Sequence, residues 1–60
     1  MNLKYYIAGV QVSEEEARKQ QATNDRIMAI DDFRQWLEAM NDAAFILAFD
    51  DTGSLQPLPF

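Results

Sequence analysis

The chain has 60 residues, near the lower limit for one domain, where folding hides only about 60% of the surface that the unfolded chain exposes. Its hydrophobic fraction of 48% and charged fraction of 25% are close to globular averages, which disfavours the disordered and fibrous classes. Without Cys or His the chain has no disulfide, usual zinc site, thiol nucleophile or imidazole base, and its net charge of −5 disfavours direct contact with nucleic-acid phosphates.

The first predicted element is a β-hairpin. Residues 3–7 are rich in Tyr and aliphatic side chains, and residues 10–12 alternate as a strand does. Ala8 and Gly9 form the turn, although Ala resists the positive φ that a two-residue turn of this kind requires. We therefore expect two short antiparallel strands.

The clearest local signal is the start of a helix at Glu14. Ser13 can cap this helix, and Glu16, three residues later, completes a capping box. The acidic first turn also favours the positive end of the helix dipole. Charges of opposite sign one turn apart support the same helix: Glu14 and Glu15 precede Arg18 and Lys19.

The end of this helix is less clearly marked. Residues 20–25 are almost all polar, which weakens the apolar face, so we predict that the helix ends between Ala22 and Asp25. Residues 27–30 are mostly apolar and should be buried. Their pattern fits an extension of the first helix, the start of a second helix or a short strand.

A second helix is predicted after Asp32, which acts as its cap with Gln35 as the reciprocal partner. An apolar stripe at helical spacing follows, formed by Phe33, Trp36, Leu37 and Met40. In a chain this short we expect the stripe to be core, with Trp36 at the centre between the sheet and the first helix. The alternative is a helix face that binds a partner.

The remaining sequence predicts a second pair of strands. Residues 43–49 form a continuous apolar run with the length of a buried strand, and residues 50–54 have turn composition. Residues 55–58 return as the partner strand. Pro57 and Pro59 place that return at the edge of the sheet, because proline cannot donate a ladder hydrogen bond.

Together these elements predict an α+β fold: a small antiparallel sheet with two helices packed on one face, in ββααββ order, as one domain over residues 1–60. Alternation along the strands assigns these side chains to the helix side: Leu3, Tyr5, Ile7, Phe45, Leu47 and Phe49. The other face, left uncovered, carries Lys4, Tyr6, Ala44, Ile46 and Ala48. We expect this face to bind a protein partner or a second copy of the chain, because a small core supplies only about 3–5 kcal/mol. A shallow, partly solvated face is the alternative.

One short motif resembles a catalytic signature. Residues 51–54, Asp-Thr-Gly-Ser after an apolar strand, are similar to the active-site signature of aspartic proteases, in which the Asp activates water as half of a carboxylate pair. The chain is shorter than the subunits of that family, and no glycine-bearing flap hairpin follows. Asp and Gly are also ordinary turn residues. We therefore assign no catalytic, cofactor-binding or metal-binding residue and expect a protein that is not an enzyme.

The acidic residues gather in three clusters, at residues 14–16, 31–32 and 50–51. They lack the alternating oxygen spacing and the central Gly of a calcium loop. An acidic surface can also imitate the phosphates of DNA, so an inhibitor of a nucleic-acid-binding protein is the alternative function. Helix starts and a turn explain the same residues locally.

The Tyr-rich first strand running into the segment from Val12 to Ala17, together with the size and acidity of the chain, resembles the accessory early-region proteins of lambda-like temperate phages. The resemblance covers about the first third of the chain and assigns no functional residue. It implies a protein that acts by binding in the cytoplasm of a bacterial host. The apolar runs are too short for a signal peptide or a membrane helix, so we expect a cytoplasmic protein without membrane contact.

Overall fold

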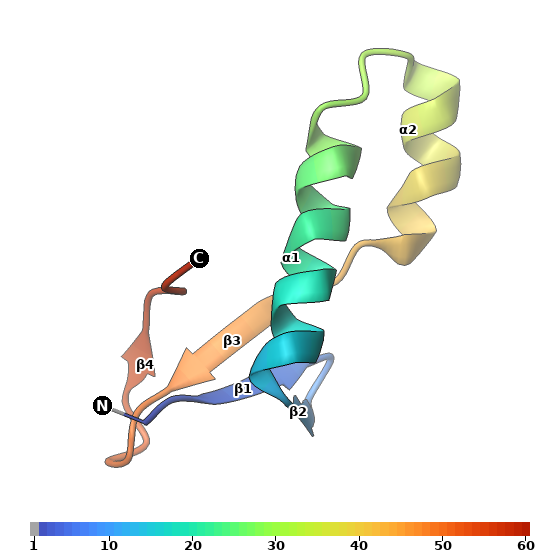
Figure 1. The fold of residues 1–60 in the computed structure, drawn as a ribbon. Coiled ribbons are helices and arrows are strands. Elements are labelled where there is room, and N and C mark those ends of the chain that lie inside the picture. The colour runs from blue at the N-terminus through green and yellow to red at the C-terminus, as the bar shows by residue number, and fades with distance from the viewer. Residues whose placement is uncertain (1) are drawn as a thin grey trace.

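The computed structural model describes residues 2–60, which form one antiparallel sheet and two helices (Figure 1). In chain order the elements are β1 (Lys4–Ile7), β2 (Val10–Val12), α1 (Glu14–Met28), α2 (Phe33–Ala39), the 3₁₀ turn η1 (Met40–Asp42), β3 (Ile46–Phe49) and β4 (Leu55–Gln56). The strands lie in the order β2-β1-β3-β4, and neighbouring strands are antiparallel. The α+β class and the ββααββ order are confirmed.

The hairpin of β1 and β2 forms as the sequence predicts, with backbone strain in its turn. Both turn residues have positive φ, 50° at Ala8 and 81° at Gly9. This combination matches the right-handed twist of the two strands, and it is unfavourable for any residue with a Cβ atom. The register that results places Tyr5 opposite Val12 and Ile7 opposite Val10.

Helix α1 begins as predicted and ends later. The Ser13 hydroxyl accepts a hydrogen bond of 3.1 Å from the Glu16 N–H, and Arg18 and Lys19 lie 3.7 and 3.8 Å from Glu14 and Glu15. The helix then continues through the polar residues to Met28, so the predicted end between Ala22 and Asp25 is wrong. Of the three possibilities for residues 27–30, the extension of the first helix is observed, for Ile27 and Met28 only. The prediction that this segment is buried holds for Ile27 and is wrong for Met28, which is 80% exposed.

Two amide side chains explain why α1 continues. Gln20 Nε2 donates to Asn24 Oδ1 (2.9 Å) and to the Asp42 carbonyl oxygen (2.8 Å). Asn24 Nδ2 donates to the Ala44 carbonyl oxygen (2.7 Å), and Asn24 Oδ1 accepts from the Ala44 N–H (3.2 Å). We call this arrangement the amide clasp. It fixes the segment after α2 to α1, so β3 begins at Ile46 rather than at residue 43.

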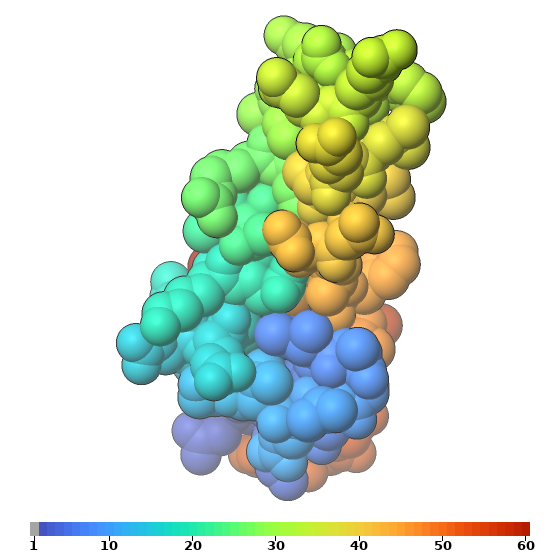
Figure 2. Space-filling model, turned by 90° about the vertical axis from the view of Figure 1, so that its right-hand side faces the viewer, coloured from blue at the N-terminus to red at the C-terminus, as the bar shows by residue number. Residues whose placement is uncertain are grey.

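Helix α2 lies beside the second half of α1, beyond the end of the sheet (Figure 1). Its cap is the predicted one, because Asp32 Oδ1 accepts from the Gln35 N–H at 3.0 Å. The molecule is therefore elongated, 41 Å long and 19 by 18 Å across, with α2 and the end of α1 above the strands and the start of α1 beside them (Figure 2). Phe33 is 68% exposed, and Leu37 and Met40 are exposed as well. The prediction that this stripe forms the core is wrong, because α2 packs on α1 rather than on the sheet.

The core lies between the first half of α1 and the inner face of the sheet. Tyr5, Ala17 and Ala48 are buried there, and partly buried apolar side chains surround them: Leu3, Val12, Ile46, Leu58 and Phe60. Ala17 and Ala48 have small side chains, which allows the helix to approach the sheet closely. Trp36 is only partly buried and lies outside this cluster.

The strand register corrects the predicted faces of β3. Tyr5 pairs with Ala48 and Ile7 pairs with Ile46, and directly opposed residues share a face of the sheet. Ile46 and Ala48 therefore face the helix, whereas Leu47 faces away. The predicted alternation was right for β1 and one residue out of phase for β3, because the small Ala48 lies where the helix comes closest.

Candidate functional site

The described part of the chain was searched for metal-binding groups and membrane-spanning helices. No group of three or more His, Cys, Asp or Glu residues among residues 2–60 could hold a metal ion. Over the same range, neither helix combines the length and the apolar character needed to span a bilayer.

The protease-like motif is a tight turn between β3 and β4 that Asp50 organises. Its carboxylate accepts from the Thr52 hydroxyl (2.6 Å), the Thr52 N–H (2.9 Å), the Ser54 N–H (3.0 Å) and Gln56 Nε2 (2.7 Å). The hydrogen bond from the Thr52 hydroxyl, followed by that from the Ser54 N–H, lowers the Asp50 pKa from 3.8 to about 2. Gly53 supplies the positive φ of 81°. Asp51, the acid of the motif, is exposed and takes no part in this network.

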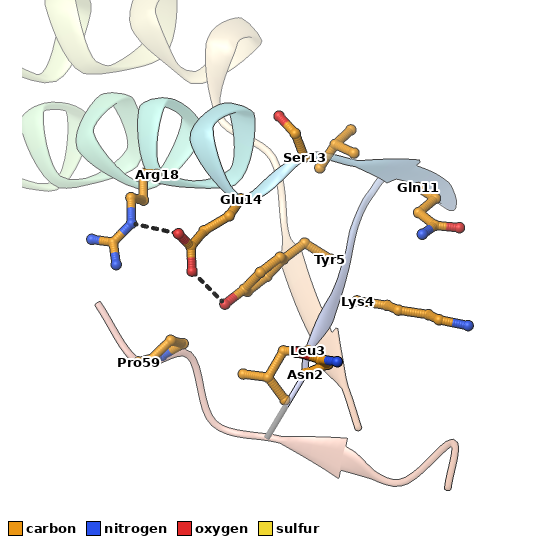
Figure 3. A pocket seen from close by; sticks show the side chains of 10 residues that line it. Asn2, Leu3, Lys4, Tyr5, Gln11, Ser13, Glu14, Arg18 and Pro59 are labelled. Atoms are coloured by element: carbon orange, nitrogen blue, oxygen red, sulfur yellow. Dashed lines mark hydrogen bonds and ion pairs between the residues drawn. The ribbon is translucent and has the colours of Figure 1, made fainter. Parts of the chain in front are cut away.

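A polar hollow of about 520 Å³ lies near the start of α1 (Figure 3). On one side of β1, the Tyr5 hydroxyl contacts Glu14 at 3.5 Å, and Arg18 binds the same carboxylate. Lys4 and Gln11 point to the other side of β1, so the polar groups do not converge on one point (Figure 3).

The C-terminal segment closes the Tyr5 side of this hollow. The Phe60 ring lies 5.7 Å from the Tyr5 ring, and the Arg18 guanidinium carbon lies 4.7 Å from the Phe60 ring centroid. Phe60 thus packs against Tyr5 of β1. These contacts are those of a packed edge of the core rather than of a reaction site.

A second hollow, of about 360 Å³, opens between α1 and α2. We call it the hairpin groove, and its apolar lining consists of Ile27, Met28, Trp36, Met40, Ala43 and Phe45. Met28 is 80% exposed and Phe45 is 91% exposed. The Ala44 backbone, held by Asn24 of the amide clasp, forms the end of the groove nearest the sheet. This groove was not predicted from the sequence, because the apolar stripe favoured the core as the place of Trp36 and Met40.

The outer face of the sheet is the other apolar surface. The register assigns six side chains to it, which we call the open sheet face: Lys4, Tyr6, Gln11, Leu47, Phe49 and Leu55. The Tyr6 and Phe49 rings meet edge to face at 5.6 Å. Of the predicted partner-binding set, Lys4 and Tyr6 lie on this face. Ala44, Ile46 and Ala48 do not, because Ala44 joins the amide clasp and the other two face α1.

The three acidic clusters do not form one surface. Residues 14–16 begin α1 beside the sheet, whereas residues 31–32 lie in the loop at the far end of α1 (Figure 1). A helix of this length separates the two by about 20 Å. Several of the acids also have local partners: Asp32 caps α2, Asp50 holds its turn, and Glu14 and Glu15 pair with bases. This arrangement weakens the case for imitation of a nucleic-acid strand.

Comparisons with protein-family models, with curated proteins and with solved structures found no significant match. The two apolar surfaces, the hairpin groove and the open sheet face, are therefore the candidate functional sites.

Proposed function

We propose that the chain is a non-enzymatic interaction protein that acts by burying apolar surface against another protein molecule. The observation that carries the proposal is the amount of surface left exposed. The accessible area is 4728 Å² for a mass of 6.9 kDa, whereas the size scaling of compact monomers gives about 4000 Å². The elongated molecule thus exposes roughly 700 Å² more surface than a compact monomer of this mass.

Large apolar side chains occupy much of this exposed surface. Among the described residues they are Val10, Met28, Phe33, Leu37, Met40, Phe45, Leu47 and Leu55. The fully buried core, by contrast, is small and includes two alanines, Ala17 and Ala48. A core of this size stabilises a domain only marginally, so burial of the exposed side chains against another molecule would add stability.

The open sheet face is suited to a second copy of the chain. Its apolar centre is flanked by Lys4 and Asp51, which line one shallow hollow of about 340 Å³ together with Tyr6 and Phe49. In a two-fold symmetric dimer, the open sheet face of one molecule packs against the same face of the other. Because this face carries a positive and a negative charge, Lys4 of one molecule can pair with an acid of the other. Two sheets packed in this way bury their facing side chains in a common layer.

A matched pair of substitutions tests this function. Leu47→Glu places a charge on the open sheet face, whereas Val10→Glu makes the same kind of change at an exposed position on the opposite face. Size-exclusion chromatography with light scattering should give a dimer mass for the native chain and for Val10→Glu at high concentration. Leu47→Glu should remain at 6.9 kDa. A native chain that is monomeric throughout, or equal behaviour of the two variants, contradicts self-association through this face.

The lack of Cys and His supports the non-enzymatic part of the proposal. The resemblance of the first third to phage accessory proteins supports a bacterial cytoplasm as the setting, with a host protein as a further partner.

A further inference from the structure

The hairpin groove has the features of a site that receives an apolar helix face. Two antiparallel helical walls, α1 and α2, enclose a volume of about 360 Å³, near the lower end of the range for ligand pockets, roughly 300–1,000 Å³. Met28 and Met40 line it, and methionine side chains adapt to partners of irregular shape. Phe45 projects beside the opening with 91% of its surface exposed. A third helix laid along this groove would cover all three side chains.

The charge around the groove indicates the chemistry of the partner. Residues 25–42 carry five acids, Asp25, Asp31, Asp32, Glu38 and Asp42, and two bases, Arg26 and Arg34. All seven side chains are exposed. This segment therefore carries three of the five net negative charges of the chain, and it forms most of the helical hairpin that contains the groove. An apolar groove in a negatively charged hairpin is complementary to an apolar helical stripe flanked by basic residues.

We propose that the hairpin groove is a second binding site, distinct from the open sheet face, that takes the apolar side of a basic amphipathic helix from another protein. A second copy of this chain fits the groove less well, because it would bring one acidic hairpin against another. The apolar lining supplies the contact area, and the net negative charge of the hairpin selects the sign of the partner's charge and speeds its approach.

Trp36 makes the site directly observable, because it is the only tryptophan and it lines the groove. The probe is a synthetic helix of about 15 residues with Leu on one face, Lys on the other and no Trp. A matched peptide has Glu in place of every Lys. We expect the Lys peptide to shift the Trp36 emission to shorter wavelength and to bind at least roughly tenfold more tightly than the Glu peptide. Added salt should narrow this difference.

Truncations separate groove binding from simple attraction of charge. Phe45→Ala and Met28→Ala leave the net charge unchanged and should each weaken binding of the Lys peptide by roughly fivefold or more. Val10→Ala truncates an exposed apolar side chain outside both binding surfaces and should leave the affinity unchanged. Circular dichroism confirms that each variant is folded.

Three results would overturn this assignment. Equal affinity for the Lys and Glu peptides would remove the role of charge, and binding that is insensitive to Phe45→Ala would show attraction to the acidic surface alone. A Trp36 emission that changes with protein concentration, and no longer does so in Phe45→Ala, would show that a second copy fills the groove. Leu47→Glu tests the open sheet face separately, so failure at either surface is distinguishable from failure at the other.

Discussion

The amide clasp provides the sharpest test of how the helical hairpin is held, through the substitution Asn24→Ala. Asn24 makes two hydrogen bonds to the Ala44 backbone, of 2.7 and 3.2 Å, across 20 residues of sequence. Each such bond contributes about 1 kcal/mol net, so their loss costs about 2 kcal/mol. Ala is the better helix former by roughly 0.5 kcal/mol, which leaves an expected net loss of about 1.5 kcal/mol.

The matched control is Gln21→Ala on the same helix. Gln21 Nε2 also donates to a side chain one turn on, Asp25 Oδ1 at 2.9 Å, but this bond is exposed and stays within the helix. Its loss costs about 0.3 kcal/mol, which the gain in helix propensity offsets.

Urea denaturation followed by circular dichroism measures both variants. With a slope of about 1 kcal/mol per M for a domain this small, Asn24→Ala should lower the midpoint by about 1.5 M. Gln21→Ala should leave the midpoint almost unchanged. If the two variants unfold at the same urea concentration, the clasp does not hold the hairpin and the explanation for the length of α1 is wrong.

Three further predictions concern the turns and the core. Ala8→Asn should stabilise the protein by roughly 1 kcal/mol in denaturant melts, because Asn tolerates positive φ better than Ala, and a lower stability would contradict the turn geometry. Trp36→Ala should remain folded and unfold cooperatively, whereas Tyr5→Ala should lower the free energy of unfolding by about 3 kcal/mol or more, because only Tyr5 lies in the core. A larger loss of stability in Trp36→Ala than in Tyr5→Ala would show that Trp36 belongs to the core. Because folding lowers the Asp50 pKa to about 2, the ionised carboxylate stabilises the fold above pH 4, and this contribution is lost as the pH falls toward 2. Asp50→Asn should therefore reduce the dependence of stability on pH in this range, as measured by thermal melts at a series of pH values. An unchanged pH profile would contradict this role of Asp50.

The sequence was most informative where structure is decided by neighbouring residues. The caps at Ser13 and Asp32 each depend on one hydroxyl or carboxylate and an amide three residues away, so the pattern identifies them without tertiary information. The turn at residues 50–54 was also predicted. Its anchor is Asp50, however, whose carboxylate reaches four groups that the turn brings together.

Neighbouring residues do not show which side chains of β3 face the helix. Residues 43–49 are all apolar, so alternation alone does not indicate which side chains face the helix. The predicted alternation turned Phe45, Leu47 and Phe49 toward the helices, yet the close approach of Ala17 requires a small residue, and Ala48 provides it. The candidate surface was therefore predicted with the right β1 residues, Lys4 and Tyr6, and the wrong residues after α2.

The position of α2 depends on contacts between residues far apart in the sequence, which the hydrophobic pattern does not predict. An apolar stripe predicts burial, but it does not say whether the sheet, another helix or a partner covers it. The amide clasp joins the end of α2 to α1 through backbone groups of Asp42 and Ala44, which leave no side-chain signal in sequence. The hairpin groove follows from this placement and was missed for the same reason.

The central claim, that the exposed apolar surface serves association, is tested most directly by a dilution series followed with two-dimensional ¹H–¹⁵N NMR of the native chain. On dilution, the amide signals of Tyr6, Leu47 and Phe49 on the open sheet face should shift together, because a second copy leaves that face. The signals of α1 residues that face solvent, such as Ala22, should stay in place. Spectra that are identical at every concentration, or shifts confined to α1 and α2, would contradict the proposed interface.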